Sequence, residues 1–212
     1  MLNLETVVTN LRKNHLNPQI VATKADVAPL VERILNDGDT VAVGGSVTLT
    51  ETGVIDLLRS GKYQFLDRYA EGLTREQKEE IFRQSFFADA YLCSSNAITE
   101  PGELYNVDGT GNRVAAIAYG PKKVIVVAGV NKIVKDLDEA VKRVKICAAP
   151  PNTQRLGFET YCNKVGHCMK VDGGMTVGCI SDMRICCSYL ITGYQRQTDR
   201  IHVILVEEEC GY

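Results

Sequence analysis

Apolar and polar residues follow one another in this chain in a pattern that predicts short buried strands separated by helices. Short apolar runs predict strands at residues 19–22, 40–43, 64–66, 90–93, 114–118, 124–128 and 201–206. Apolar residues at helical spacing predict helices at residues 3–15, 23–35, 50–58, 74–87 and 136–145. This alternation is typical of an α/β fold, in which an open, mostly parallel sheet carries helices on both faces.

The pattern divides the chain into two parts. Residues 1–150 carry the strand-helix alternation, and we expect them to form one α/β domain. After Pro150 and Pro151 the sequence becomes rich in glycine and cysteine. Residues 151–212 are therefore expected to form a cysteine-rich extension packed on the same domain, with the strand at 201–206 returning to the edge of the sheet.

Polar loops that contain glycine follow three of the predicted strands, at residues 44–46, 95–113 and 129–132. Because the carboxyl ends of parallel strands meet at one edge of a sheet, we expect the three loops to form one ligand site. The residues expected to surround this site are Gly44, Gly45, Ser46, Asn96, Thr99, Asn112, Arg113, Asn131 and Lys132.

The residue types at these loops predict a small anionic ligand. Glycines before a helix expose backbone N–H groups, Arg113 can bind a carboxylate or phosphate through two hydrogen bonds, and Lys132 adds a point charge. The alternative is structural, with Arg113 paired to Glu100, Glu103 or Asp108. Neither the dinucleotide nor the ATP-binding glycine motif is present, so there is no nucleotide fingerprint.

Four cysteines of the extension lie close together in sequence, in the order C-x5-C-x10-C-x6-C: Cys162, Cys168, Cys179 and Cys186. Four thiolates in a loop-rich segment indicate a metal centre, and we prefer a [4Fe–4S] cluster over zinc. His167 is an alternative ligand. The other interpretation is that these cysteines are small buried apolar residues, as we expect for Cys93 and Cys147.

Composition narrows the class of protein. The chain has 212 residues, 45% of them hydrophobic, and a net charge of −2, which provides no basic surface for nucleic acid or an anionic membrane. No apolar stretch approaches the roughly 20 residues that cross a bilayer. The first residues read as an amphipathic helix rather than a secretion signal. We therefore expect a cytoplasmic protein whose thiols stay reduced.

Four segments resemble the LUD domain family of lactate utilisation: GGSVTLTETG at 44–53, SSNAITEPGELYNVDGTGNRVAAI at 94–117, YGPKKVIVVAGVNKIV at 119–134 and the stretch from Asp136 to Ala149. The cysteine tail, with RIC at 184–186, resembles the extension of one branch of that family, although its gap of ten residues between the second and third cysteines is longer. The resemblance implies an open α/β sheet similar to that of the sugar-phosphate isomerase and CoA-transferase superfamily.

The resemblance also implies a function in the oxidation of lactate or other organic acids, beside iron–sulfur partner proteins. The chain is then expected to bind a small anionic metabolite, as a subunit of an oxidoreductase. One alternative is a non-catalytic electron-transfer or scaffold subunit that acts through the metal centre. Another is a CoA-transferase-like or isomerase-like enzyme that uses Glu51, Glu100 or Glu103. The substrate, a catalytic residue and the formation of a homo-oligomer stay open.

Overall fold

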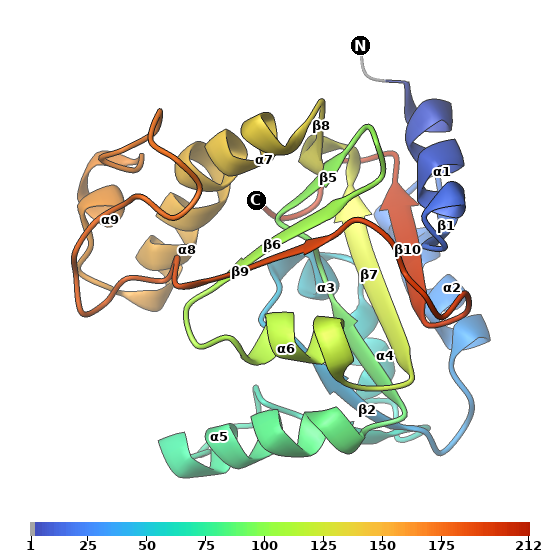
Figure 1. Cartoon of the computed structure of the whole chain (residues 1–212). Coiled ribbons are helices and arrows are strands. Elements are labelled where there is room, and N and C mark those ends of the chain that lie inside the picture. Colours follow the sequence, from blue (N-terminus) through green and yellow to red (C-terminus); the bar gives the residue numbers. More distant parts are fainter. Residues whose placement is uncertain (1–2) are drawn as a thin grey trace.

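A six-stranded, fully parallel sheet forms the centre of the molecule in the computed structural model, which describes residues 3–212 (Figure 1). Its strands, in spatial order, are β1 (Asn17–Val21), β10 (Ile201–Val206), β7 (Lys123–Gly129), β4 (Ala90–Cys93), β2 (Thr40–Val43) and β3 (Gln64–Leu66). Every neighbouring pair in this sheet runs parallel. The predicted fold class is confirmed.

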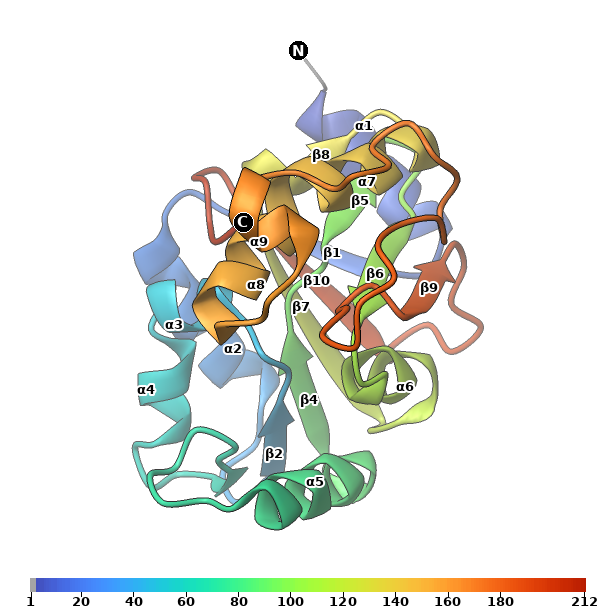
Figure 2. The same ribbon diagram turned by 90° about the vertical axis from the view of Figure 1, so that its left-hand side faces the viewer.

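Helices cover both faces of this sheet, as Figure 2 shows. One face packs on α1 (Leu4–Lys13) and α6 (Asn112–Tyr119). The other packs on α2 (Val27–Ile34), α3 (Val47–Glu51) and α4 (Val54–Leu58). Successive residues of β7 alternate between the two cores, because side chains of a strand point to opposite faces in turn. Both sides of the central strands are therefore apolar, which explains their unbroken runs of β-branched residues.

A second, four-stranded sheet lies beyond the carboxyl ends of the main strands (Figure 1). Its strands are β8 (Ile133–Val134), β5 (Ala97–Thr99), β6 (Leu104–Asp108) and β9 (Ser188–Thr192). The stretch at 95–113, expected to be a loop, thus contains two strands. Strand β9 belongs to the cysteine-rich part of the chain and pairs antiparallel with β6. Residues 151–212 therefore contribute one strand to each sheet.

The remaining helices are α5 (Arg75–Gln84), α7 (Leu137–Arg143), α8 (Ala149–Leu156) and α9 (Tyr161–Val165), with a π-helical turn at Val144–Ala148 between α7 and α8. Pro150 and Pro151 do not end the domain but lie in the first turn of α8, where a missing N–H group is tolerated. Within the described residues, no helix combines the length and the apolar character needed to span a bilayer.

The predicted strand at 114–118 is wrong, because these residues lie in α6. The carboxylate of Asp108 accepts the N–H groups of Arg113 and Val114, which satisfies donors of the first helical turn. Gly111, with φ of +86°, turns the chain into the helix. The predicted helix at 50–58 is likewise divided, at Gly53, whose φ of +70° separates α3 from α4.

Two predictions about burial and position are also wrong. The strand at 201–206 is not at the edge: β10 lies between β1 and β7, and its residues pair with both neighbours. In the predicted helix at 74–87, α5 ends at Gln84 and Phe87 is 91% exposed instead of buried. The amphipathic pattern of that segment is weak, and helix α5 has no buried residue.

Candidate functional site

A cleft of about 710 Å³ opens at the carboxyl ends of β2, β4 and β7, which are neighbours in the main sheet. It is the place where the three predicted loops converge. Of the residues predicted for the site, six line the cleft: Gly45, Ser46, Asn96, Asn112, Arg113 and Lys132. The other three, Gly44, Thr99 and Asn131, do not line it.

Those three residues have contacts that hold the protein together. A Cβ atom added to Gly44 would lie 3.0 Å from Cδ of Arg113, so this position requires a close backbone approach. The hydroxyl of Thr99 donates to the Glu103 carboxylate at 2.8 Å. The Asn131 side chain bonds to the backbone of residues 210 and 211 at both of its polar atoms. Their part in the predicted site is thus at most indirect.

The turn at 44–46 uses most of its own polar groups. The N–H of Gly44 donates to the carbonyl of Leu92, and the N–H of Ser46 donates to the hydroxyl of Tyr69. The Ser46 hydroxyl caps α3 by accepting the N–H of Leu49. Strong anion binding by the backbone of this turn is therefore not supported, and side-chain cations become the more important feature of the cleft.

Arg113 forms the buried centre of the cleft wall. Its side chain is 10% exposed, and its five N–H groups have acceptors on five residues: Asp108, Ser94, Asn106, Asn96 and Val107. The ion pair with Asp108 is 2.8 Å long. Because every donor is already used, the expected bidentate binding of an anion by Arg113 has to be corrected: this residue ties the loop after β4 to β6 and α6.

Lys132 is 3% exposed and lines the cleft between β7 and α3. Its Nζ donates to the hydroxyls of Thr48 and Ser94, both at 2.9 Å. No carboxylate forms an ion pair with it within the described chain. Burial lowers the pKa of Lys132 to about 7, and the positive charges of Arg143 and Arg113 act in the same direction. A large fraction of this side chain is therefore a neutral amine near pH 7.

Arg68 is a site residue that the sequence analysis missed. Its guanidinium lies 4.5 Å from the ring centre of Phe82, and a Cβ atom added to Gly45 would be 3.6 Å from Nη2. Among the described residues it has neither a hydrogen bond nor an ion pair with protein, so its donors face the cleft unused. Its position just after the strand at 64–66 could have indicated a place at the same edge of the sheet.

Most of the other charged side chains of the cleft already have partners within the protein. Arg75 pairs with Glu79 at 3.1 Å, and Arg155 bonds to Asn152 and to the Tyr212 hydroxyl. Two acidic residues, Asp108 and Asp182, line the cleft against six basic ones. The excess of positive charge favours an anion. No glutamate lines the cleft in residues 3–212, so nothing here supports a glutamate-dependent transferase or isomerase.

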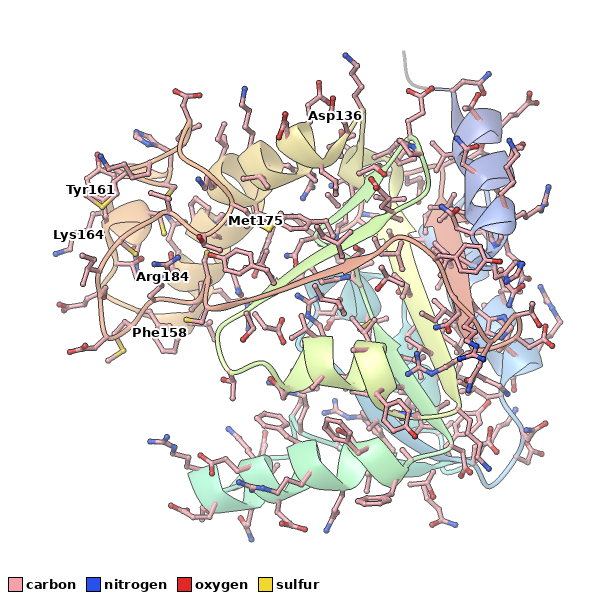
Figure 3. The ribbon with its side chains drawn as sticks, viewed as in Figure 1. Asp136, Phe158, Tyr161, Lys164, Met175 and Arg184 are labelled. Carbon is pink, nitrogen blue, oxygen red and sulfur yellow. The ribbon has the colours of Figure 1, made fainter. Side chains whose placement is uncertain are left out.

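A second cavity lies inside the cysteine-rich part, and all four predicted cysteines line it: Cys162, Cys168, Cys179 and Cys186. Figure 3 shows Met175 and Arg184 inside this part of the molecule and Lys164 pointing outward. Arg184 donates to the carbonyls of Cys179 and Cys186 and so holds two cysteine-bearing segments together. Cys147 is exposed and does not line the cavity.

The residue types that line this cavity suit a metal centre, but their side chains do not surround a single point. Among residues 3–212, no three His, Cys, Asp or Glu side chains form a group that could hold a metal ion. A tetrahedral zinc site requires four such atoms around one ion, whereas in an iron–sulfur cluster the thiolates bind different irons and lie further apart. The cavity of about 30 Å³ has room for one water. Three of the four thiols that would hold a cluster lie in the irregular segment at 166–187: Cys168, Cys179 and Cys186.

The cleft and the cysteine cavity share a wall. Residues that line both are Val144, Ala149, Arg184, Ile185 and Cys186. Burial raises the pKa of the Cys186 thiol to about 12, and the other cysteines add to this effect. We therefore expect that binding of a metal at the cysteines would alter the wall of the cleft.

Comparison with known proteins agrees with this architecture. The model of the LUD domain matches residues 4–206. A DUF162 family protein from Deinococcus radiodurans has a similar structure, with a TM-score of 0.53, 16% identity, and 96% of this chain and 95% of that chain covered. The beta subunit of eIF2B from Chaetomium thermophilum aligns with a TM-score of 0.38 and 19% identity, over 57% of this chain and 42% of that one. No curated protein matches the sequence. The chain therefore belongs to the LUD domain family, which is associated with lactate utilisation.

Proposed function

We propose that this protein binds a small organic-acid anion of the lactate type in the cleft, as a cytoplasmic component of an organic-acid oxidising system. The observation that carries the proposal is Arg68, a cation at the cleft whose donors have no protein partner in residues 3–212. The cation–π contact with the Phe82 ring holds the guanidinium beside the cleft, and its N–H groups remain available to a carboxylate. Membership of the LUD domain family supports an organic acid as the ligand.

Calorimetric titration with L-lactate, D-lactate, pyruvate and inorganic phosphate tests this proposal. A charge-assisted hydrogen bond contributes about 1.5–3 kcal/mol, so Arg68→Gln should weaken binding of the preferred anion by about 10- to 100-fold. Arg33→Gln is the matched control, because it removes the same charge from an exposed position of α2 outside the cleft. Absence of binding at about 10 mM, above the usual range of KM values, would refute the proposal.

A second candidate function is supported by the cysteine cavity: an electron-transfer or scaffold subunit that works with iron–sulfur partner proteins. Four thiols from distant positions face one cavity, and a [4Fe–4S] cluster bound there would supply one-electron transfer. The residues that would hold it are Cys162, Cys168, Cys179 and Cys186. The thiol pKa of Cys186 is raised by burial, so binding of a metal has to displace its proton.

Anaerobic purification with analysis of iron, sulfide and zinc tests this second function. Cys179→Ser should abolish the bound iron, and Cys147→Ser, at an exposed cysteine outside the cavity, should leave it unchanged. Loading should also change hydrogen exchange in residues 166–187, since three of the four thiols lie there. Protein that stays metal-free after reconstitution with iron and sulfide would refute this function.

A further inference from the structure

The hydrogen-bond partners around Nζ of Lys132 match the two N–H groups of a neutral amine. The Thr48 hydroxyl donates its proton to the carbonyl of Cys210 at 3.3 Å, and the Ser94 hydroxyl donates to the carbonyl of Ser95 at 3.4 Å. Each hydroxyl oxygen is then left to accept one N–H from Nζ. These two bonds use both N–H groups of an amine and leave its lone pair unused. An ammonium in the same place would have a third N–H without a partner in the described chain.

Lys145 provides the contrast within the same molecule. It is also buried, at 5% exposure, but its Nζ donates to three backbone carbonyls, of residues 170, 173 and 174, at 2.7–3.0 Å. Carbonyl oxygens only accept, so these three bonds use three N–H groups of Nζ. Burial alone therefore does not distinguish the two lysines, whereas the number of acceptors does.

The charges around Lys132 favour the same state. The titratable and charged groups that face it from the neighbouring elements are Arg113 of α6, Arg143 of α7, Cys93 of β4, Glu51 of α3 and Cys210. The two arginines disfavour a further positive charge. Glu51 acts in the opposite direction but is exposed, and its carboxylate pairs with Lys24 and accepts the N–H of Gly211. The Glu51 carboxylate, which could have stabilised an ammonium at Lys132, is thus bound to other groups.

We propose that Lys132 is a nucleophile that forms a reversible imine with the carbonyl group of a 2-oxo acid bound in the cleft. This inference rests on the proposed function, because the same cleft has to bind the carboxylate. It narrows the ligand class: the amine needs a carbonyl carbon, and the unpaired guanidinium of Arg68 needs an anionic group. A 2-oxo acid carries both on adjacent carbons.

The chemistry balances without an added oxidant or reductant. The Nζ lone pair attacks the carbonyl carbon and a C–N bond forms, giving a carbinolamine. The carbon–oxygen bond then breaks, and the oxygen leaves as water with the two hydrogens that were on Nζ. The hydroxyls of Thr48 and Ser94, which line the cleft beside Nζ, are placed to pass these protons. Hydrolysis reverses each step.

Borohydride trapping tests the inference on the whole chain. Pyruvate and sodium borohydride should give a single reduced adduct, and peptide mapping should place it on Lys132 and not on Lys145. Lactate, which has no carbonyl group, should give none. The rate of trapping should rise as the pH passes about 7, whereas ordinary lysines react only toward about 10.4. Lys132→Met, which removes the amine and has a similar length, should lose the adduct while remaining folded by circular dichroism.

The outcomes separate this inference from the proposed function. Pyruvate that binds in calorimetry without forming an adduct on Lys132 overturns the imine and leaves the anion site standing. An adduct spread over surface lysines, or one that persists in Lys132→Met, also overturns it. If neither pyruvate nor lactate binds and no adduct forms, both proposals fall. A single adduct on Lys132 that is reduced at least 10-fold in yield by Arg68→Gln supports both.

Discussion

Replacement of Lys132 by methionine should make the protein more stable at pH 6 and should remove a pH dependence that the wild type has. The pKa of Lys132 is lowered from its ordinary value of 10.5 to about 7, chiefly by burial. Below about pH 7 the folded and unfolded chains both carry this proton, and the folded state bears the full cost of the buried charge. Between about 7 and 10.5 only the unfolded chain holds the proton, so stability rises with pH.

The size of the effect follows from the pKa difference. At about 1.36 kcal/mol for each pH unit, the cost of the buried ammonium is on the order of 5 kcal/mol below pH 7, and roughly 3 kcal/mol of it is relieved between pH 7 and 9. Methionine has a similar length and no charge, so it keeps the packing. Its loss of two hydrogen bonds, about 1 kcal/mol each, leaves a net gain at low pH.

Urea denaturation at several pH values measures this difference. The chain has no tryptophan, so circular dichroism is the suitable signal. The free energy of unfolding of the wild type, minus that of Lys132→Met, should rise by roughly 3 kcal/mol from pH 7 to pH 9. Parallel pH curves for the two proteins would refute the reasoning. So would a wild type more stable than the variant at pH 6, since Lys132 would then be stabilised as a cation.

Three further predictions concern the walls of the cleft. Arg113→Met should lower the free energy of unfolding by about 3–5 kcal/mol in urea, because the buried carboxylate of Asp108 loses its partner; wild-type stability would show that Asp108 is solvated instead. Gly129→Ala should lower the melting temperature, since its Cβ would lie 2.5 Å from backbone atoms of Cys210 and Glu208, whereas Gly45→Ala should be nearly neutral. Iron loading at the cysteines should change the calorimetric affinity for the anion, because Cys186 lines both spaces; equal affinities in loaded and metal-free protein would contradict this coupling.

The main sheet could be predicted because its signal is local. Strand β7, for example, sends Val124 and Val126 to one core and Ile125 and Val127 to the other, so its sequence is apolar throughout. The strand at 40–43 was predicted with the bounds that β2 has. The order of these strands was not predictable in the same way, since the placement of β10 between β1 and β7 depends on contacts far apart in sequence.

Errors arose where a short segment takes its structure from distant partners. The short apolar run at residues 114–118 is compatible with a strand and with a helix. The helix forms because the Asp108 carboxylate accepts N–H groups of the first turn of α6. The segments of β5 and β6 are short and lie in a polar stretch; they pair with each other, and also with β8 and β9, which lie further along the chain. Local sequence contains neither fact.

The convergence of the three loops could be predicted, but not the state of their side chains. Three loops after parallel strands were expected to meet, and their residues do line one cleft. Which cation binds a ligand depends on the partners that each one already has. The sequence indicated Arg113 as the free cation, yet the fold satisfies it completely. Arg68, which has no hydrogen bond or ion pair with residues 3–212, comes from a fourth segment.

Three basic residues of the cleft differ in how many of their donors the protein uses, and this difference assigns them separate roles. Arg113 has acceptors for all five N–H groups, so it holds the wall in place. Lys132 has acceptors for two N–H groups, the number that a neutral amine can donate. It is therefore suited to act as a nucleophile rather than to attract an anion by charge. Arg68 has none among the described residues, and its charge is the one still available to a ligand. A cleft built this way attracts an anion with one residue and presents a nucleophile with another, while the buried Arg113 ties the loop after β4 to β6 and α6.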